Sequence, residues 1–428
     1  MQRRLYTLIL YLTMPLVLSR LLWRARRAPA YARRWRERFG LVPSVPVTNA
    51  KPRPAIWLHS VSVGETLAAV PLIKTLQRKY PEYLLIVTTT TPTGSEQVQK
   101  LFADSVYHVY APYDLPGALR RFLTRLKPSA LIIMETELWP NLIHGCRRRG
   151  IAVALVNARL SEKSARGYRR IGGLTKPMLA ELDLVAAQGQ ADGERFIELG
   201  LARDKLLISG NIKFDLELDQ AVRDKAATLK RQWRAAGERP VVLAASTHQG
   251  EDEQVLNAFA EVLSAMPRVL LVLVPRHPER FDSVAALCRT RGFHTLRRSE
   301  GAAVTSEIQI LLGDTMGELL AFCGAADIAF IGGSLVPVGG HNLIEPAAWG
   351  VPVLTGPHLF NFAEVATKLD EAGGLEVCAD AGELAKALLR LLDDRDSYET
   401  MAQAARTVAE TNRGALDRLT ERLSLLLG

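Results

Sequence analysis

Short apolar segments alternate with longer amphipathic segments along most of this chain of 428 residues. The apolar segments have the length and composition of buried strands, and the segments between them are long enough for helices. Strands separated by helices pair in parallel, in a sheet that helices cover on both faces. The pattern therefore predicts a doubly wound α/β fold. The predicted strands are 55–60, 83–89, 105–110, 130–134, 151–156, 182–187 and 206–209, followed by 240–245, 268–274, 309–312, 326–331 and 351–354.

Residues 212–239 interrupt this alternation, because they are polar and helical in pattern and carry no strand signal. The alternation then restarts, which predicts two Rossmann-like domains. We assign residues 41–215 to the first domain, 216–239 to a connecting helix and 240–428 to the second domain. Two parallel sheets joined by one connection are expected to face a cleft between the carboxyl ends of their strands, where ligands bind in such folds.

The positive charge of the chain is concentrated in residues 1–40. This segment contains ten arginines and one acidic residue, Glu37, which accounts for the whole formal net charge of +9. Because the remainder is formally neutral, we do not expect a nucleic acid as a partner. One basic end on a neutral body is typical of a protein that associates with an anionic membrane surface.

Residues 5–19, within this segment, are apolar and uncharged. The run is shorter than the ~20 residues that span a bilayer upright, although flanking arginine side chains extend its reach. No small-residue cleavage site follows it, so we expect an uncleaved anchor. The anchor either spans the membrane once or lies in the interface. Its arginine-rich flank places the body of the chain on the cytoplasmic side.

The sequence lacks the motifs of several common enzyme classes. It contains neither a Walker A sequence nor a G-x-G-x-x-G fingerprint, which argues against a P-loop ATPase and a nicotinamide-binding fold, and it has no G-x-S-x-G nucleophile elbow. Its four cysteines form no C-x-x-C pair, so we expect neither disulfides nor a zinc site. We predict no metal and no other cofactor.

The candidate functional residues follow predicted strands. The first is Glu65, which opens a helix after strand 55–60. A carboxylate held at a cleft can act as a general base when its pKa is modestly raised. The alternative is structural, because Ser62 and Glu65 also have the spacing of a helix capping box.

Two further strand ends of the first half carry charged residues. Glu135 and Glu137 follow strand 130–134 and indicate a polar network or a pair of carboxylates at the start of a helix. Metal binding there is weakly supported, because no histidine lies at a suitable spacing. Lys213 follows strand 206–209 and could stabilise negative charge on a leaving phosphate, or could be a solvated surface lysine.

A glycine-rich stretch, residues 332–346, follows strand 326–331 and precedes a predicted helix at 343–349. Glycines allow the backbone to approach a ligand closely, and the start of a helix favours an anion. Gly339 and Gly340 are therefore candidates for a phosphate loop. Glu345 could accept hydrogen bonds from a ribose diol, or could simply interact with the helix dipole.

The remaining candidates lie at neighbouring strand ends of the second half. Arg276, after strand 268–274, could hold a phosphate through two hydrogen bonds. Met316 and Gly317, after strand 309–312, could bind a base or phosphate through their backbone N–H groups. Residues 246–248 follow strand 240–245 in the same way.

Taken together, these motifs resemble the 3-deoxy-D-manno-octulosonic acid (Kdo) transferases of lipopolysaccharide synthesis, which are glycosyltransferases of the GT-B fold. The resemblance covers nearly the whole chain, including the anchor with its arginine-rich flank. It is carried by W-L-H-S-V-S-V-G-E at 57–65, E-T-E-L-W-P-N at 135–141, N-I-K-F-D at 211–215, P-R-H-P-E-R at 275–280, G-D-T-M-G-E at 313–318 and G-G-H-N-L-I-E-P-A at 339–347.

The resemblance implies an inverting transfer of Kdo from CMP-Kdo to the lipid A precursor, lipid IVA, at the cytoplasmic face of the inner membrane. It implies that Glu65 is the catalytic base and that Glu135 and Lys213 support the transition state. It implies an acceptor-binding first domain and a donor-binding second domain. The implied CMP-binding positions are Pro275, Arg276, Met316, Gly317, Glu318, Asn342 and Glu345.

Two other interpretations fit the same fold. One is another membrane-associated GT-B glycosyltransferase, or a nucleotide-sugar epimerase, that uses a UDP-sugar. The other is a non-catalytic membrane scaffold with a vestigial nucleotide fold. Charged residues at six separate strand ends argue against the scaffold, because a protein without chemistry does not require charged side chains at these positions.

Overall fold

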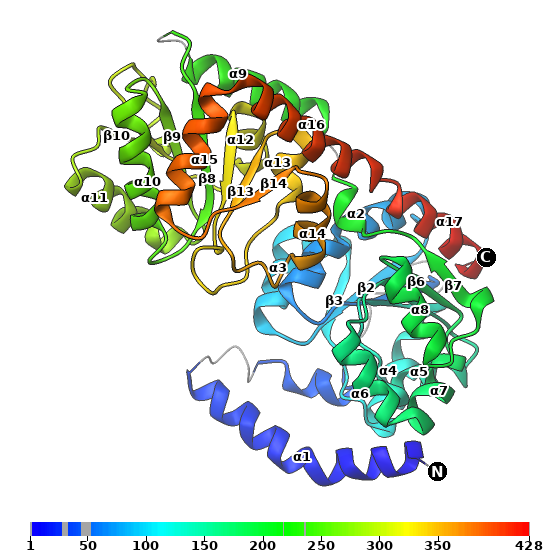
Figure 1. Cartoon of the computed structure of the whole chain (residues 1–428). Coiled ribbons are helices and arrows are strands. Elements are labelled where there is room, and N and C mark those ends of the chain that lie inside the picture. Colours follow the sequence, from blue (N-terminus) through cyan, green and yellow to red (C-terminus); the bar gives the residue numbers. More distant parts are fainter. Residues whose placement is uncertain (1, 28–32, 44–52, 217, 235–236, 428) are drawn as a thin grey trace. The chain divides into compact units, whose positions relative to one another are not determined.

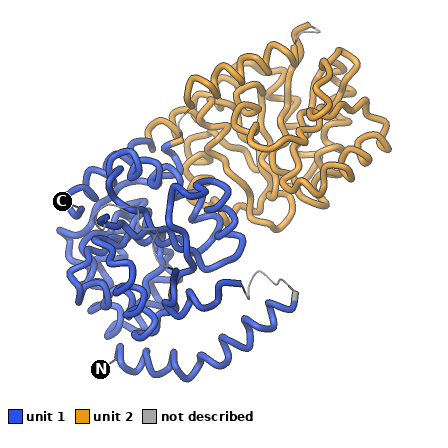
Figure 2. The backbone as a smooth tube through the Cα atoms, turned by 180° about the vertical axis from the view of Figure 1, so that it is seen from behind, with its two compact units in different colours: residues 1–215, 413–428 blue, residues 216–412 orange. Residues whose placement is uncertain are grey.

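A computed structural model describes residues 2–27, 33–43, 53–216, 218–234 and 237–427 (Figure 1). The chain divides into two compact units (Figure 2). Unit 1 comprises Met1–Asp215 and Arg413–Gly428, and unit 2 comprises Leu216–Asn412.

Unit 1 contains a sheet of seven parallel strands in the order β3-β2-β1-β4-β5-β6-β7. The strands predicted for the first half of the chain are confirmed. The central strands β1, β4 and β5 are buried along almost their whole length because helices cover both faces, whereas the edge strand β7 is only partly buried. Their bounds are β1 Ala55–His59, β2 Leu84–Thr89, β3 Tyr107–Tyr110, β4 Ala130–Met134, β5 Ala152–Ala158, β6 Leu184–Ala187 and β7 Leu206–Ile208.

The helices of unit 1 connect these strands, and several of them begin at signals that are local in sequence. Proline occupies the first position of α3, α4 and α5, where its missing N–H removes no helical hydrogen bond. The helices are α2 Val63–Lys79, α3 Pro92–Phe102, α4 Pro116–Leu126, α5 Pro140–Arg147, α6 Glu162–Arg170, α7 Gly172–Ala180 and α8 Gln190–Glu198, with short 3-10 turns η2 Trp35–Phe39, η3 Ala103–Ser105, η4 Arg203–Lys205 and η5 Ile212–Phe214.

The last helix, α17 (Ala415–Leu427), also belongs to unit 1. Its residues Leu419 and Leu423 lie in the same apolar cluster as Ile56 of β1 and Leu72 of α2. The second domain predicted at 240–428 therefore differs from unit 2 at its end, because the apolar face of α17 is buried against the first sheet.

Unit 2 contains a second sheet of seven parallel strands, in the order β10-β11-β9-β8-β12-β13-β14. The five strands predicted for this half are confirmed. Two three-residue edge strands, β10 and β14, were not predicted, and each is buried at only one position. The bounds are β8 Val241–Thr247, β9 Leu270–Pro275, β10 Thr295–Arg297, β11 Ile310–Leu312, β12 Ile328–Ile331, β13 Val353–Thr355 and β14 Leu375–Val377.

The helices of unit 2 include α9, which lies within the segment predicted as a connection at 216–239. In the structure α9 packs onto the unit, with the ring of Trp233 centred 5.5 Å from that of Phe322 in α12. The helices are α9 Gln220–Trp233, α10 Asp252–Ala265, α11 Phe281–Thr290, α12 Leu319–Ala325, α13 Ile344–Trp349, α14 Ala363–Glu371, α15 Ala381–Asp393 and α16 Arg395–Thr411, with 3-10 turns η6 Pro278–Arg280 and η7 Arg298–Glu300.

The predicted anchor forms one continuous helix, α1 (Gln2–Arg27), and Gln2–Arg26 is long enough and apolar enough to cross a membrane. Near its start the helix is attached to the body of unit 1. The Tyr6 hydroxyl donates to Asp114 Oδ2 at 2.9 Å, and the Thr7 hydroxyl donates to Asn141 Oδ1 at 3.1 Å. Leu12 and Leu16, on the exposed side, are each 71% exposed.

Candidate functional site

Glu65 lies in the first turn of α2, directly after the carboxyl end of β1. Ser62 is the N-cap residue, and its hydroxyl oxygen accepts the Glu65 N–H at 3.3 Å. The Glu65 carboxylate in turn accepts the Val61 N–H at 2.7 Å and the Ser62 O–H at 2.9 Å. These bonds resemble a capping box, except that the carboxylate accepts the N–H of Val61 instead of that of the N-cap residue Ser62, and they fix the position of the carboxylate.

The surroundings of Glu65 favour its protonated form. The residue is 9% exposed, and burial raises its pKa to about 7, with smaller contributions from the negative charges of Glu135 and Glu137. The hydrogen bonds from Val61 and Ser62 act in the opposite direction. A carboxyl group that titrates near neutral pH can accept a proton from a hydroxyl group and release it again.

Glu135 and Lys213 lie at the same carboxyl edge of the unit 1 sheet. Glu135 follows β4, the neighbour of β1, and has a left-handed backbone with φ of 57°. Its N–H donates to Val156 O at 2.9 Å, and its Oε1 lies 3.7 Å from Lys213 Nζ. The structure thus brings together the three residues predicted as catalytic.

Lys213 comes from the far edge of the sheet, because η5 follows the edge strand β7. Asn157, at the end of β5, directs η5 back over the sheet by accepting the Ile212 N–H on its Oδ1 at 3.1 Å. Asn211 donates to Gln188 Oε1 at 3.2 Å from the same turn. The sequence analysis missed Asn157 and Gln188, whose only signal was a polar residue after a predicted strand.

The sequence analysis offered Glu135 and Glu137 as a pair of carboxylates at the start of a helix, and the structure does not show this arrangement at α5. Neither Glu135 nor Glu137 caps that helix, and Glu137 instead accepts the Trp139 ring N–H at 3.0 Å. The carboxylate at the helix start is Asp114, which accepts the N–H groups of Asn141 and Leu142 at 3.1 and 2.6 Å. A distant residue therefore performs the function that local spacing assigned to a neighbour.

In unit 2, the glycine-rich stretch lies between β12 and α13 and is organised by Glu251. This residue is 0% exposed, and its carboxylate accepts the N–H groups of Gly333, Ser334 and Leu335 at 2.7, 3.0 and 2.9 Å. It also accepts the His248 N–H at 3.1 Å. The sequence analysis missed Glu251, because a glutamate at the start of α10 looks like an ordinary helix-end charge.

The glycines of this stretch have distinct functions. At Gly332, a Cβ atom would lie 2.7 Å from Glu251 Oε2, so no larger residue fits beside the carboxylate. The N–H groups of Gly339 and Gly340, predicted as a phosphate loop, donate to Gly333 O at 3.0 and 2.8 Å. They close the turn on itself, and their phosphate role stays a prediction.

Asn342, Glu345 and Arg276 form a polar group next to this turn. Asn342 donates to Glu345 Oε1 at 2.9 Å and accepts the Ile344 N–H at 3.1 Å, which fixes both side chains at the start of α13. Burial raises the pKa of Glu345, while the Asn342 hydrogen bond and the charge of Arg276 oppose the rise. Arg276 follows Pro275 at the end of β9, where its N–H donates to Thr247 O at 3.0 Å.

Two histidines lie beside Arg276: His248, from the predicted strand end at 246–248, and His341, to which the sequence analysis gave no role. His248 Nε2 and His341 Nε2 are 2.8 Å apart, and the two ring planes are parallel to within 5° with centroids 5.0 Å apart. Burial, together with the neighbouring cationic side chains, lowers the pKa of His341 to about 4. Burial also lowers the pKa of His248, so both surroundings disfavour the charged imidazolium.

The segment Met316-Gly317-Glu318 lies at the carboxyl end of β11. Glu318 accepts hydrogen bonds from Thr315 and Arg298 and forms an ion pair with Lys225, whose Nζ lies 3.0 Å away. Burial acts to raise the pKa of Glu318, but these partners outweigh it and hold the pKa below its usual range. Met316 is 59% exposed, and Gly317 has a left-handed φ of 81°.

Comparisons with known proteins agree with both halves of this description. Residues 33–216 match the family model for 3-Deoxy-D-manno-octulosonic-acid transferase (kdotransferase), and residues 253–408 match the model for Glycosyl transferases group 1. The chain is 43% identical over 424 residues to the 3-deoxy-D-manno-octulosonic acid transferase of Haemophilus influenzae, a match that covers 99% of this chain and 98% of that protein. It is 38% identical over 443 residues to the Bordetella pertussis protein of the same name, with complete coverage of both.

A solved structure extends the comparison to the fold. The S. aureus MnaA-UDP co-structure is 15% identical, covers 88% of this chain and 97% of that chain, and has a TM-score of 0.55. At this identity the likeness concerns the fold alone. Together with the two parallel sheets, it confirms the predicted α/β class of GT-B type.

Proposed function

The chain belongs to the 3-deoxy-D-manno-octulosonic acid (Kdo) transferase family, and we propose on this premise that it transfers Kdo from CMP-Kdo to a lipid A precursor. Membership of this family shows that the protein is a glycosyltransferase. The observation that supports the proposal is the group of Glu65, Glu135 and Lys213, in which a buried carboxyl group has a pKa of about 7.

Glu65 is the base in the proposed reaction. Its carboxylate takes the proton of an acceptor hydroxyl group while that oxygen attacks the anomeric carbon of Kdo. The bond between this carbon and the phosphate oxygen of CMP breaks, and CMP leaves with the bonding electrons. A single displacement inverts the configuration at the anomeric carbon and requires no covalent enzyme intermediate. Lys213, held 3.7 Å from Glu135, offsets negative charge that develops at the reacting centre.

Unit 2 holds the donor in this proposal. Arg276 supplies a guanidinium group for the phosphate, and the Glu345 carboxylate accepts hydrogen bonds from the ribose hydroxyl groups. Asn342 orients Glu345 through the 2.9 Å hydrogen bond between them. The backbone of Met316 and Gly317 contacts the cytosine ring of CMP. Glu318 fixes that loop through its ion pair with Lys225.

We further propose that α1 lies along an anionic membrane interface at the cytoplasmic face of the inner membrane. Tyr6 and Thr7 bond to Asp114 and Asn141 of the body, and a helix that crossed the bilayer would carry these two residues away from their partners. Leu5, Leu8, Leu12 and Leu16 are exposed on one side of the helix. In the proposed placement these leucines face the acyl chains, while Tyr6 and Thr7 keep the helix attached to the body.

Membrane extraction tests this placement. The full chain is expected to float with anionic vesicles and to be released from native membranes by alkaline carbonate, because an interfacial helix has no segment across the bilayer. Removal of residues 2–27 should strongly weaken flotation. Retention of the full chain in the carbonate pellet would contradict the interfacial placement and favour a spanning helix.

Mass spectrometry of the reaction product tests the function directly. Purified full-length protein with CMP-Kdo and lipid IVA is expected to yield a product heavier by one or more Kdo units, with CMP released in equal number. Thermal stability should rise with CMP and not with UDP, since ligands that bind only the folded state stabilise it. A rise with UDP or a UDP-sugar alone would favour another glycosyltransferase or an epimerase, and no response to any nucleotide would favour a scaffold.

A further inference from the structure

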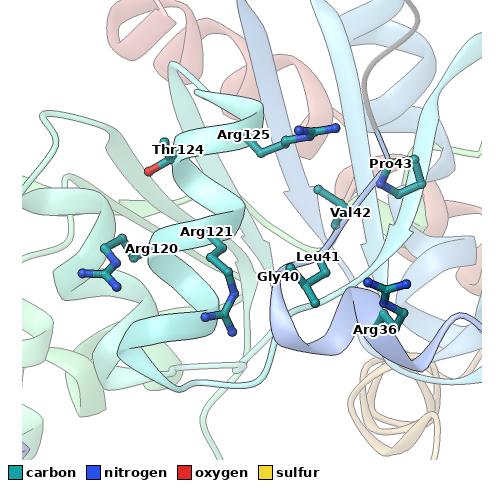
Figure 3. A pocket seen from close by; sticks show the side chains of 9 residues that line it. All are labelled: Arg36, Gly40, Leu41, Val42, Pro43, Arg120, Arg121, Thr124 and Arg125. Carbon is teal, nitrogen blue, oxygen red and sulfur yellow. The ribbon is translucent and has the colours of Figure 1, made fainter.

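Unit 1 contains a pocket of about 900 Å³ that the sequence analysis did not predict (Figure 3). One wall is the segment 36–43, and the other is helix α4. Because α4 connects two parallel strands, it runs from the carboxyl edge of the sheet to the amino edge, and the pocket lies along its second half. Glu65 lies at the carboxyl edge, so the pocket is separate from the proposed base. It is lined by Arg36, Gly40, Leu41, Val42, Pro43, Arg120, Arg121, Thr124 and Arg125.

The two walls are held together by specific contacts. Arg121 donates from Nε and Nη2 to Phe39 O at 2.9 and 2.7 Å. Gly40 has a φ of 75°, and a Cβ atom there would lie 2.0 Å from Ala118 O, so the segment packs directly onto α4. The Tyr107 hydroxyl, on β3, donates to Pro43 O at 2.7 Å. The pocket is therefore formed by the fold itself and needs no ligand to shape it.

The charge of the lining is entirely positive. Four arginines line the pocket and no acidic side chain does. Within the part of the chain that the structure describes, no ion pair within 4 Å joins Arg36, Arg120 or Arg121 to a carboxylate. In Figure 3, Arg121 and Arg125 extend from α4 toward the segment that carries Arg36. The four arginine side chains make the electrostatic potential of the pocket positive, which attracts an anion.

The number of arginines and their charge favour a phosphate monoester as this anion. A guanidinium group presents parallel N–H donors that match two phosphate oxygens, and several arginines favour an anion with more than two oxygens and more than one charge. A phosphate monoester provides three terminal oxygens and close to two negative charges at neutral pH. A phosphodiester provides only one charge and two terminal oxygens.

The surroundings of the pocket point to a lipid as the source of the phosphate. Leu41, in the lining, is 47% exposed, and Trp35, in the adjoining turn η2, is 49% exposed. Tryptophan beside arginine is typical of the headgroup level of a membrane. Helix α1 passes close to the first turn of α4, since the Tyr11 hydroxyl lies 3.8 Å from the position of a Cβ atom on Gly117, and the pocket lies along the second half of the same helix.

We propose that this pocket binds the phosphate monoester group of an anionic membrane lipid, at a site separate from the reaction centre. The inference rests on the membrane placement proposed above and does not depend on the identity of the sugar that is transferred.

Vesicle binding by the full-length protein tests the proposal, with phosphatidic acid as the phosphomonoester lipid and phosphatidylglycerol as the phosphodiester lipid at matched surface charge. The double variant Arg36→Gln/Arg125→Gln is expected to bind phosphatidic acid vesicles at least tenfold more weakly, because each charge-assisted hydrogen bond to the phosphate monoester that is lost costs on the order of a tenfold change in affinity. Its binding to phosphatidylglycerol should change much less. The variant Arg36→Lys/Arg125→Lys, which keeps the charge and loses the paired donors, should bind both lipids about equally.

A matched control separates the pocket from general charge attraction. Arg166 and Arg170, on α6, are exposed and lie outside the pocket lining. Arg166→Gln/Arg170→Gln should retain the preference for phosphatidic acid.

Two results would overturn the proposal. One is that Arg36→Gln/Arg125→Gln weakens binding to both lipids equally, and the other is that Arg166→Gln/Arg170→Gln loses as much binding to phosphatidic acid as Arg36→Gln/Arg125→Gln does. Tight binding of inorganic phosphate, lost in Arg36→Gln/Arg125→Gln without any change in vesicle binding, would show a free-phosphate site and overturn the lipid assignment. Unchanged thermal unfolding of each variant confirms that it is folded.

Discussion

Replacement of Glu65 by Gln is expected to lower the rate of sugar transfer by about a thousandfold while CMP binding is unchanged, since a general base typically contributes on the order of 10²- to 10⁴-fold. Glutamine retains a side-chain oxygen that can accept the Val61 N–H, and glutamine also satisfies a capping box. The variant therefore keeps the structural function of residue 65 and loses only proton acceptance. Product formation by mass spectrometry and CMP binding by calorimetry are the two measurements.

Ser62→Ala is the matched control for this variant. It removes the N-cap hydroxyl group, which typically costs about 1 kcal/mol of stability, but it leaves the carboxylate in place. We expect Ser62→Ala to retain most of the activity. If Glu65→Gln transferred Kdo at close to the wild-type rate, the assignment of the base would be wrong, and Glu65 would be a capping residue only.

The pH profile gives an independent readout of Glu65. Its carboxylate is the active form, and burial raises its pKa to about 7. Below that pKa the group is mostly protonated and cannot accept a proton, so the rate should rise with pH, with a midpoint near pH 7, and level off at higher pH. Loss of the Ser62 hydrogen bond in Ser62→Ala should move the midpoint upward, because that bond stabilises the charged form. The Glu65→Gln variant should show no such rise.

Replacement of Glu251 by Ala is expected to have the second large effect, this time on unit 2. Its carboxylate is the acceptor for four backbone N–H groups, three of them in the turn Gly333–Leu335. Removal leaves buried donors without a partner, and the expected loss is roughly 4 kcal/mol in the free energy of unfolding. CMP binding should weaken as well, because this turn leads directly into His341, Asn342 and Glu345.

Two measurements separate the local effect from general destabilisation. Denaturant unfolding reports the stability, and hydrogen exchange reports the protection of the amides of residues 333–335. Glu253→Ala, an exposed glutamate on the same helix, is the control and should change both by little. Full protection of these amides in Glu251→Ala would show that the turn does not depend on the carboxylate.

The strand pattern was predictable from sequence because burial on both faces requires a continuous apolar run, and such a run is visible locally. The strands that were missed, Thr295–Arg297 and Leu375–Val377, lie at sheet edges, where one or both faces reach solvent and no such run is needed. The position of α17 was missed for a related reason. Its amphipathic pattern shows that it buries one face, but not which of the two sheets it covers.

The candidate site was predictable to the extent that it consists of charged residues that directly follow strands. Glu65, Glu135 and Lys213 were identified in this way, and in a parallel sheet the carboxyl ends of the strands all lie along one edge. Their partners were not predictable. Asp114, Asn157 and Glu251 each bond to backbone groups far away in sequence, for example Ile212 N–H in the case of Asn157. Such pairings depend on three-dimensional distance, and sequence spacing carries no information about it.

The sequence by itself therefore determined the fold class, the family and the residue types available at the strand ends, because periodicity and short motifs are properties of neighbouring residues. Only the tertiary structure decided how those residues are held and charged. It showed that Glu65 caps α2 and yet titrates near neutral pH, since burial by distant segments outweighs two local hydrogen bonds. It also placed four arginines from two separate segments around one pocket. Burial and electrostatic interactions act through space, so neither result follows from the order of residues along the chain.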